Sequence, residues 1–465
     1  MQDLGKFSPF REKMEKAGLS ESAIRTFEFN YNNLIRGETG LIPETSIEPV
    51  QSVPALEQVK KTTPLRKELL SRTVVLKLNG GLGTSMGLEK AKSLLKIKGD
   101  LTFLDFIARQ IIQLRKENGA DLAFLLMNSQ STSSDTVTFL ERYPELGKRE
   151  DYELLQSFVP KVDANTMRPV EWPENLQLEW CPPGHGDIYP SLVDSNWLKK
   201  LITTGKQFLF VSNSDNLGAS LDLHLLAWFA DKGYPFLMEV AERTSADKKG
   251  GHLACRGKSL LLRESAQCPE GDTSCFQDIS RHKFFNTNNL WIDLVQLNAA
   301  LEMNNGFLPL PMIRNNKTVD PRNKQSTKVI QLETAMGAAI GCFENAAAVL
   351  VPRSRFAPVK TTSDLLGLRS DLFQTTVDWR LELDPVRKGI PPLLDLDDNY
   401  KMVDQLDAGF PEGAPSLIEA ISLKVKGSFV ISPQTSFEGN VILENKSAAR
   451  VTLASRKYQE EQVVV

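Results

Sequence analysis

The sequence predicts an α/β protein with a mostly parallel central sheet, a small helical part before it and a β-helix after it. Three observations support this prediction. Apolar residues recur at helical spacing over residues 9–35, short apolar runs alternate with amphipathic segments from Thr73 onward, and the helical spacing fades after Leu383. At 465 residues the chain is also too long for one simple core, so two or three domains are expected.

The first 60 residues are expected to form a helical part and a linker. Residues 9–35 are rich in Glu, Lys, Arg, Ala and Leu, which favour helices. Pro43, Pro49 and Pro54 then mark a segment that does not continue as a helix.

The central domain is expected to span residues 61–383. Its strand candidates are residues 74–78, 122–127 and 208–212, and its helix candidates are residues 103–116 and 221–232. Such alternation predicts a mostly parallel sheet with helices on both faces. Binding sites in sheets of this kind lie beyond the carboxyl ends of the strands.

Residues 384–465 are expected to form the C-terminal domain. Four apolar residues fall six positions apart, which is the spacing of hexapeptide-repeat β-helices: Val425, Ile431, Phe437 and Leu443. An antiparallel β-domain with turns at residues 438–440 and 444–446 is the alternative.

Composition excludes several classes of protein. Apolar residues make up 41% of the chain, charged residues 24%, and the net charge is −3, so neither disorder nor a nucleic-acid partner is expected. No apolar stretch approaches the length of a membrane span, and the start carries no apolar signal segment, which favours a cytoplasmic protein without a membrane partner. The five cysteines are scattered and are expected to be reduced.

A glycine-rich segment follows the first predicted strand. Residues 79–84 read Asn-Gly-Gly-Leu-Gly-Thr, and three glycines in four positions let several backbone N–H groups converge on a phosphate or a base edge. The segment lacks the glycine-lysine pair of a P-loop, and Met86 stands where a dinucleotide fingerprint needs its third glycine. A nucleotide cradle is predicted, and a plain tight turn is the alternative.

Charged residues follow two of the predicted strands. Lys90 and Lys92 come shortly after the glycines, and one of the two is expected to face the site. Asp215 ends an apolar strand, where its carboxylate is placed to bind Mg²⁺. A solvated turn and a helix cap are the respective alternatives.

Three further segments have side chains suited to a ligand. His185 lies between two glycines, so it is expected to touch ligand rather than pack on an apolar face. Residues 285–291 supply neutral amides that suit sugar hydroxyls, although asparagine-rich turns are common. Residues 349–360 carry three cations and two prolines, which suits phosphoryl transfer, although an exposed basic loop fits too.

Read together, these segments resemble the eukaryotic-type UTP–glucose-1-phosphate uridylyltransferases, also called UDP-glucose pyrophosphorylases. The resemblance runs from about Thr73 to Leu366, and it is carried by the stretches LNGGLGTSMG, PPGHGDIY, FVSNSDNLGA, FNTNNLW, LETAMGAAIG and VPRSRFAPVKTTSDLL. It implies a Rossmann-like nucleotidyltransferase domain between a small N-terminal part and a C-terminal β-helix.

The resemblance also implies roles for individual residues. It places uracil and ribose near Leu78, Asn79, Gly80, Gly81, Met127, Gln156, Gly184 and His185. It assigns the sugar to Asn213, Glu239, Gly251, Asn286 and Asn288, and Mg²⁺ to Asp215. Lys92 would hold the departing pyrophosphate and Lys360 would neutralise the phosphates at the reacting centre, whereas Arg353 and Arg355 receive no firm role. The chain departs from the family pattern at residues 89–93, where Gly-Pro-Lys-Ser is usual, and around Gln156.

The implied reaction joins UTP to glucose 1-phosphate, giving UDP-glucose and pyrophosphate. A phosphate monoester has a second pKa near 6, so its attacking oxygen is already ionised and needs no strong base. A pyrophosphorylase of broader sugar choice and a non-catalytic nucleotide-binding scaffold are the alternatives, and the displaced third glycine disfavours a Rossmann dehydrogenase. Whether the C-terminal domain mediates a homo-oligomer or caps a monomer stays open.

Overall fold

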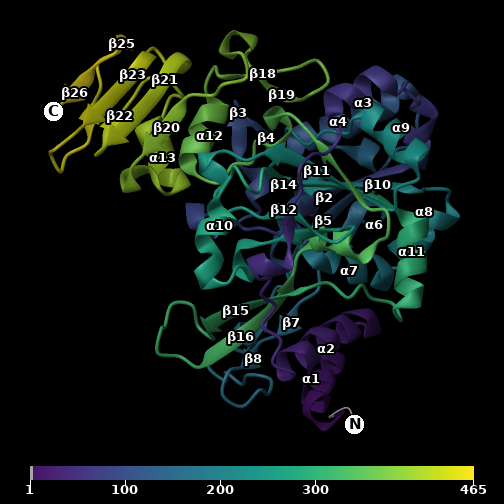
Figure 1. The fold of residues 1–465 in the computed structure, drawn as a ribbon. Helices are drawn as coiled ribbons and strands as arrows, with labels where there is room; N and C mark the ends of the chain where they lie inside the picture. The colour runs from purple at the N-terminus through teal and green to yellow at the C-terminus, as the bar shows by residue number, and fades with distance from the viewer. Residues whose placement is uncertain (1–3) are drawn as a thin grey trace.

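A ten-stranded mixed sheet forms the centre of the computed structural model, which describes residues 4–465 (Figure 1). Its strands are β1 (Glu48–Pro49), β2 (Thr73–Asn79), β5 (Ala123–Asn128), β6 (Glu153–Leu155), β10 (Phe208–Asn213), β11 (Phe236–Glu242), β12 (His252–Arg256), β13 (Ser259–Arg263), β14 (Phe284–Asp293) and β17 (Ala347–Leu350). They run in the order β1-β12-β14-β10-β2-β5-β6, with β11 on β14 and β17, and β13 on β12. Residues 1–3 of the predicted N-terminal part lie outside the described residues.

The core of this sheet is rich in parallel pairs. Strand β2 is parallel to both β5 and β10, β5 to β6, and β11 to β17. Strand β14 is antiparallel to β10 and β11, which makes the sheet mixed. The predicted α/β class is therefore confirmed.

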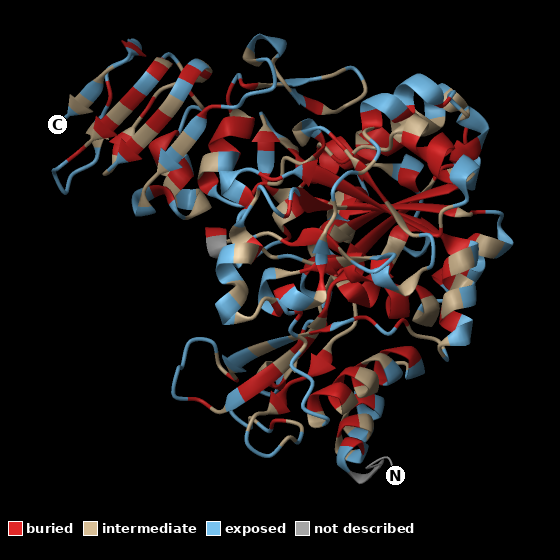
Figure 2. Cartoon of the chain, viewed as in Figure 1, coloured by how far each residue is buried: buried red, intermediate tan, exposed pale blue. Residues whose placement is uncertain are grey.

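Helices cover both faces of the sheet. Alternate residues of β2 enter opposite cores, Val75 on one side and Val74 and Leu76 on the other. The first core includes residues of α3 (Leu56–Thr62), α4 (Phe103–Asn118), α9 (Leu223–Lys232) and α12 (Thr362–Arg369), and the second those of α7 (Ile188–Asp194), α8 (Trp197–Thr203) and α11 (Leu294–Met303). The remaining helices of this region are α5 (Gln130–Leu140), α6 (Arg149–Tyr152) and α10 (Thr273–Gln277). Figure 2 shows the central strands buried and the outer helix faces exposed.

The N-terminal helices α1 (Leu4–Lys16) and α2 (Glu21–Ile35) pack against a small sheet at one end of the molecule (Figure 1). That sheet contains β8 (Val162–Asp163), β15 (Met312–Thr318) and β16 (Lys328–Thr334), with β7 (Val159–Pro160) and β9 (Trp180–Cys181) paired beside it. Phe10 and Tyr31 share a buried cluster with Val162 and Ile330. The helices thus share a core with segments far along the chain.

Parallel strands make up the C-terminal end of the molecule. They are β20 (Leu393–Leu396), β21 (Ser416–Lys426), β22 (Phe429–Val430), β23 (Ser436–Glu444), β24 (Val451–Thr452), β25 (Lys457–Gln459) and β26 (Gln462–Val464), with α13 (Val403–Gly409) beside them. Every pairing among these described strands is parallel. The antiparallel alternative is therefore wrong.

Two short hairpins, β3 (Lys96–Lys98) with β4 (Leu101–Thr102) and β18 (Phe373–Thr375) with β19 (Leu381–Leu383), complete the described strands. Among residues 4–465, no helix is both long enough and apolar enough to span a bilayer.

Candidate active site

Three predicted binding residues lie side by side at the carboxyl ends of neighbouring parallel strands. Leu78 on β2 pairs in register with Met127 on β5 and with Asn213 on β10. Parallel strands open a crevice at this edge, where the loops that follow them meet. The sheet thereby brings together residues that are up to 135 positions apart in the chain.

Asn79 ties these strand ends together through its side chain. Its amide nitrogen donates to Asn128 Oδ1 at 2.8 Å and to Thr136 Oγ1 at 3.0 Å, and its amide oxygen accepts from Ser214 Oγ at 3.1 Å. The side chain is thus fully committed, and the residue is only 2% exposed. Asn79 can therefore meet a ligand through its backbone, not its amide.

The glycine-rich loop lies directly against Gln156. A Cβ atom on Gly80 would fall 2.8 Å from Gln156 Oε1, and Gln156 Nε2 donates to the carbonyl of Gly184 at 3.0 Å. Further along the loop, Gly83 adopts a φ of +64°, which a side-chain-bearing residue rarely takes. Gln156 thus bridges two of the predicted nucleotide-binding segments.

His185 is held in one tautomer next to the obligate glycine Gly184. A Cβ on Gly184 would lie 2.4 Å from the Thr334 carbonyl oxygen. His185 Nδ1 accepts the backbone N–H of Met336 at 2.9 Å, so Nε2 carries the ring proton. Burial lowers the pKa of His185 to about 4, which keeps the ring neutral at neutral pH. His185 can therefore offer a single Nε2–H donor to a ligand.

Lys92 and Asp215 form an ion pair close to the glycine-rich loop. Lys92 Nζ lies 2.7 Å from Asp215 Oδ2, each side chain is 18% exposed, and the Lys92 backbone N–H donates to the Gly81 carbonyl at 3.1 Å. Lys90, two positions earlier, is exposed, so Lys92 is the one of the two lysines that contacts Asp215. The pair joins the predicted phosphate-binding cation to the predicted metal ligand.

Two of the predicted sugar residues, Asn286 and Asn288, lie beside a third, Gly251. The backbone N–H of Asn286 donates to the Gly251 carbonyl at 3.1 Å, and the amide of Asn286 donates to Asn288 Oδ1 at 2.8 Å. A Cβ on Gly251 would fall 2.5 Å from Glu264 Oε2. Burial raises the pKa of Glu264.

Glu264 is a candidate site residue that sequence reasoning missed. A carboxylate beside Gly251 is suited to accept hydrogen bonds from sugar hydroxyls. Its only sequence signal is its place in the run Arg-Glu-Ser-Ala-Gln, which has no recognisable pattern. The hairpin of β12 and β13 brings it opposite Gly251.

Glu239, expected to contact the sugar, is instead fully engaged inside the protein. Its carboxylate accepts from Arg355 Nη2 at 2.7 Å, Trp291 Nε1 at 3.0 Å and Asn289 Nδ2 at 3.0 Å, and the residue has no exposed surface. Strand alternation turns this side chain into the core that also contains Trp291. The carboxylate therefore already has protein partners, and a direct contact between Glu239 and a sugar stays a prediction.

The segment after β17 carries three basic side chains, of which one is exposed and two form ion pairs with acidic residues. Lys360 is exposed, and its Nζ lies 5.6 Å from the Phe356 ring and 6.0 Å from the Phe285 ring, next to Asn286. Arg353 forms two hydrogen bonds to Asp247, and Arg355 is buried against Glu239. Of the three, Lys360 is the one free to meet a phosphate.

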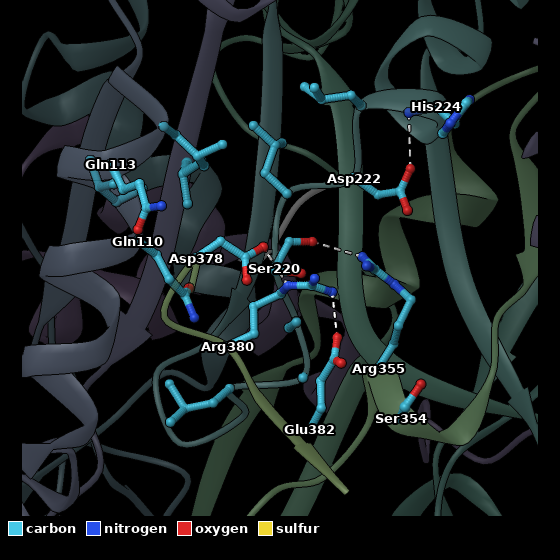
Figure 3. Close-up of a pocket in the computed structure, with 18 of the residues that line it drawn as sticks. Gln110, Gln113, Ser220, Asp222, His224, Ser354, Arg355, Asp378, Arg380 and Glu382 are labelled. Atoms are coloured by element: carbon cyan, nitrogen blue, oxygen red, sulfur yellow. Dashed lines mark hydrogen bonds and ion pairs between the residues drawn. The ribbon is translucent and has the colours of Figure 1, made fainter. Parts of the chain in front are cut away.

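A cavity of about 750 Å³ lies elsewhere, between α3, α4, α9 and the loops around residues 217–224 and 378–382 (Figure 3). None of the predicted site residues lines it, but Lys77 and Arg355 do. Lys77 Nζ donates to Ser212 Oγ and to the Ala219 carbonyl, both at 2.7 Å, and burial lowers its pKa to about 7. This cavity therefore adjoins the strands of the site without being the site.

The possible metal ligands and the cysteines can be located in the described part of the chain. No group of three or more His, Cys, Asp or Glu side chains there could enclose a metal ion. Mg²⁺ typically takes only one or two carboxylates together with substrate phosphates, so Asp215 alone is compatible with it. All five cysteines are unpaired, and burial raises the pKa of Cys181 to about 12, which makes its thiol unreactive.

Comparison with protein families gives a match over most of the chain. A family described as UTP–glucose-1-phosphate uridylyltransferase matches residues 24–438. The uridylyltransferase of Saccharomyces cerevisiae is 40% identical over 396 residues, 85% of this chain and 78% of the yeast protein. The corresponding protein of Hordeum vulgare is 37% identical over 456 residues, covering 96% and 94% of the two chains.

Solved structures match over nearly the whole chain. A mutant of UDP-glucose pyrophosphorylase from Leishmania major in complex with UDP-glucose superposes with a TM-score of 0.93 at 45% identity, covering 99% of each chain. A UDP-glucose phosphorylase from Trypanosoma brucei superposes with a TM-score of 0.90 at 47% identity, covering 99% of this chain and 100% of the other. The resemblance noted in the motifs therefore extends to the whole fold.

Proposed function

The chain belongs to the UTP–glucose-1-phosphate uridylyltransferase family, and from this premise we propose how its own residues join UTP to glucose 1-phosphate to give UDP-glucose and pyrophosphate. An oxygen of the sugar phosphate attacks the α-phosphorus of UTP in line, and pyrophosphate leaves from the opposite side. The attacking oxygen is ionised near neutral pH, so no general base and no covalent intermediate are needed. The protein's contribution is to position two polyanions and to neutralise their charge.

Uridine occupies the edge formed by β2 and β5 in this proposal. Backbone groups of residues 78–81, together with Met127 and Gln156, surround the base and ribose, and Gly184 allows close approach of the chain. His185 donates its Nε2–H to a base oxygen. The fixed tautomer of His185 supports this role, because a neutral ring with one free donor suits a carbonyl oxygen.

Lys92 and Lys360 neutralise the phosphates. Lys92 meets the departing pyrophosphate, and Lys360, which is exposed beside Phe285, meets the phosphates at the reacting centre. Asp215 would hold Mg²⁺: its carboxylate already accepts a cation, the Lys92 ammonium, at 2.7 Å. When bound, Mg²⁺ supplies charge neutralisation and orientation of the phosphate oxygens.

The sugar is bound by the side chains and backbone around Gly251. Asn213, Asn286 and Asn288 offer amides to the hydroxyls, and Glu264 adds a carboxylate acceptor. Glu239 acts behind this layer by holding Arg355. The mixture of amides and one carboxylate supports a neutral, hydroxyl-rich ligand.

We also propose three parts of the chain: residues 1–60, 61–383 and 384–465. The last part is a parallel β-helix, which is supported by the pairing of Val425 with Leu443, eighteen positions or three hexads later, and by the burial of Ile431 and Phe437 between them. We also propose a cytoplasmic location.

The observation that carries the proposal is the contact of Lys92 with Asp215 beside the glycine-rich loop. The test is a pyrophosphate-release assay over a grid of nucleoside triphosphates and sugar 1-phosphates, with and without Mg²⁺. We expect turnover to be fastest with UTP and glucose 1-phosphate and to require Mg²⁺. Absence of activity with this pair would contradict the proposal.

A further inference from the structure

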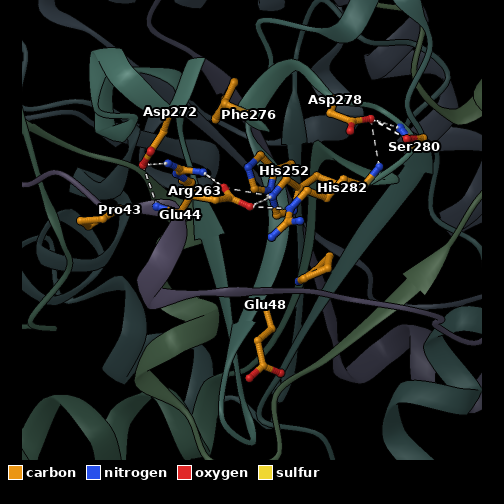
Figure 4. Close-up of polar contacts among 12 residues, drawn as sticks. Pro43, Glu44, Glu48, His252, Arg263, Asp272, Phe276, Asp278, Ser280 and His282 are labelled. Carbon is orange, nitrogen blue, oxygen red and sulfur yellow. Dashed lines mark hydrogen bonds and ion pairs between the residues drawn. The ribbon is translucent and has the colours of Figure 1, made fainter. Parts of the chain in front are cut away.

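A buried charged cluster connects the N-terminal linker to the hairpin that carries the proposed sugar site (Figure 4). We call it the Glu44 cluster; it consists of Glu44, Arg263, Asp272, Arg281 and His282. The Glu44 carboxylate accepts from Arg263 Nη1 at 2.6 Å, from Arg281 Nε at 2.6 Å and from His282 Nε2 at 3.0 Å. Three donors from a distant part of the chain thus converge on one carboxylate of the linker.

Arg263 depends on this cluster for its charge balance. Its side chain has no exposed area, and its two ion-pair partners are Glu44 and Asp272, whose Oδ2 lies 3.1 Å from Nη2. The same Asp272 oxygen accepts the backbone N–H of Glu44 at 2.7 Å. Because a guanidinium cannot lose its proton in a protein, removal of the Glu44 charge leaves a buried cation underpaired and displaces it.

A first route leads from Arg263 to the sugar site. Arg263 ends β13 and pairs in register with His252, the first residue of β12. Glu264 follows Arg263 directly in the chain. Its carboxylate packs closely on Gly251, because a Cβ atom on that glycine would lie only 2.5 Å from Glu264 Oε2. A displacement of Arg263 therefore changes the spacing between Glu264 and Gly251.

A second route leads through two stacked imidazoles. His282 and His252 lie with ring centroids 3.8 Å apart and planes 24° apart, and His252 follows Gly251 directly. Burial lowers the pKa of both rings, so they are neutral at neutral pH. His282 Nε2 then carries the proton that Glu44 accepts, because a carboxylate can only accept. Glu44 thereby fixes the ring that His252 stacks on.

We propose that Glu44 is a positioning residue for glucose 1-phosphate: it holds Gly251 and Glu264 at the separation that the sugar hydroxyls require. This inference rests on the proposed sugar-binding role of those two residues. Glu44 lies in the linker between the N-terminal helices and the sheet, outside the segments that carry the family motifs. Its effect is transmitted through Arg263 and His282, so it alters sugar affinity without touching substrate.

The test compares Glu44→Gln with Glu48→Gln in steady-state kinetics of the full chain. Glu48 lies four residues further along the same linker, and its carboxylate is exposed and makes no contact drawn in Figure 4. Both variants lose one negative charge, but only Glu44→Gln removes it from the Glu44 cluster. We expect Glu44→Gln to raise the KM for glucose 1-phosphate about tenfold while the KM for UTP changes less than about twofold. Glu48→Gln is expected to leave both values unchanged.

Two milder variants keep the test decisive if Glu44→Gln does not fold. Glu44→Asp retains the charge and is expected to restore much of the sugar affinity. His282→Phe keeps the ring stack but removes the hydrogen bond to Glu44, and we expect it to raise the KM for glucose 1-phosphate about threefold.

The outcomes separate this inference from the proposed function. A wild-type protein that makes no UDP-glucose contradicts the function itself, and an unchanged KM for glucose 1-phosphate in Glu264→Gln contradicts the placement of the sugar site. If Glu264→Gln raises that KM whereas folded Glu44→Gln and His282→Phe behave like Glu48→Gln, the sugar site stands and the positioning role of Glu44 is overturned.

Discussion

Lys92 and Asp215 are in direct contact, with Nζ 2.7 Å from Oδ2, although 123 positions separate them in the chain. The contact joins the loop after β2 to the loop after β10, at the edge where three parallel strands end. An incoming triphosphate with Mg²⁺ would compete for both partners. The pair therefore links these two loops and is expected to exchange partners when substrate binds.

Lys92→Ala should lower kcat by about 10²-fold, because one preorganised cation is then missing from the phosphates. Lys90→Ala is the matched control, since Lys90 is exposed in the same segment. Steady-state pyrophosphate release measures both variants. Equal turnover of the two would remove Lys92 from the site.

Asp215→Asn should weaken the dependence on Mg²⁺, because a neutral amide is a poorer ligand for a hard cation than a carboxylate. We expect the Mg²⁺ concentration for half-maximal activity to rise at least about tenfold, a loss of about 1.4 kcal/mol. A Mg²⁺ titration of initial rates provides the measurement. A titration curve identical to that of the wild type would place the metal elsewhere.

Lys360→Ala should lower turnover by about 10²-fold or more, because Lys360 is the free cation of the segment after β17. Lys401→Ala removes an exposed lysine outside the site and serves as the control. Both variants are compared with the wild type at saturating substrate. Near-normal turnover in a folded Lys360→Ala protein would reject its role at the reacting centre.

Glu239→Gln should destabilise the protein by about 3 kcal/mol, because it leaves the buried Arg355 without its counter-charge. Glu242→Gln, at the exposed end of the same strand, is the control and should have little effect. Urea unfolding followed by circular dichroism gives the free energy of unfolding. A fully stable Glu239→Gln protein with a raised KM for glucose 1-phosphate would instead restore a direct sugar role.

His252→Phe should reduce the loss of stability in mild acid. Burial lowers the pKa of His252 from 6.5 to about 3 in the folded chain, so only the unfolded chain binds this proton between those values. Stability from this group is present above pH 6.5 and is lost as the pH falls. Between about pH 7.5 and 5.5 the wild type should lose about 1.4 kcal/mol relative to the variant.

Urea titrations of the two proteins at both pH values provide this measurement. Titrating groups that do not contact His252 cancel in the difference, since both proteins share them; His282, which stacks on His252, is the exception. A difference in unfolding free energy that stays constant with pH would show that His252 titrates normally in the folded state.

The strands and helices that position the site could be predicted from the pattern of apolar residues in the sequence. The apolar runs at residues 74–78, 122–127 and 208–212 correspond to β2, β5 and β10, and residues 103–116 correspond to α4. These segments were predictable because period and length distinguish a buried strand from an amphipathic helix. The carboxyl-end location of Asp215 then followed from the rule for parallel sheets.

The face of the sheet to which an individual side chain points could not be predicted in the same way. Glu239 pairs with Asn289 on the neighbouring strand, and the register between the two strands shifts immediately after Glu239, at Val240. Period-two alternation says that neighbours point to opposite faces, but not which face is the site. Glu264 was missed for a related reason, since its place opposite Gly251 depends on a hairpin register.

The pairing of β1 with β12 has a consequence for how the protein is made. Glu48 lies opposite Cys255, 207 positions later. Ribosomes add roughly 5–20 residues per second, so the linker emerges roughly 10–40 s before its partner strand exists. During that interval Ile47, which is buried in the finished protein, has no surface to cover it. The linker is thus synthesised long before β12 is available to pair with it. Nascent chains that are arrested before β12 emerges should therefore be cleaved by proteases in the linker.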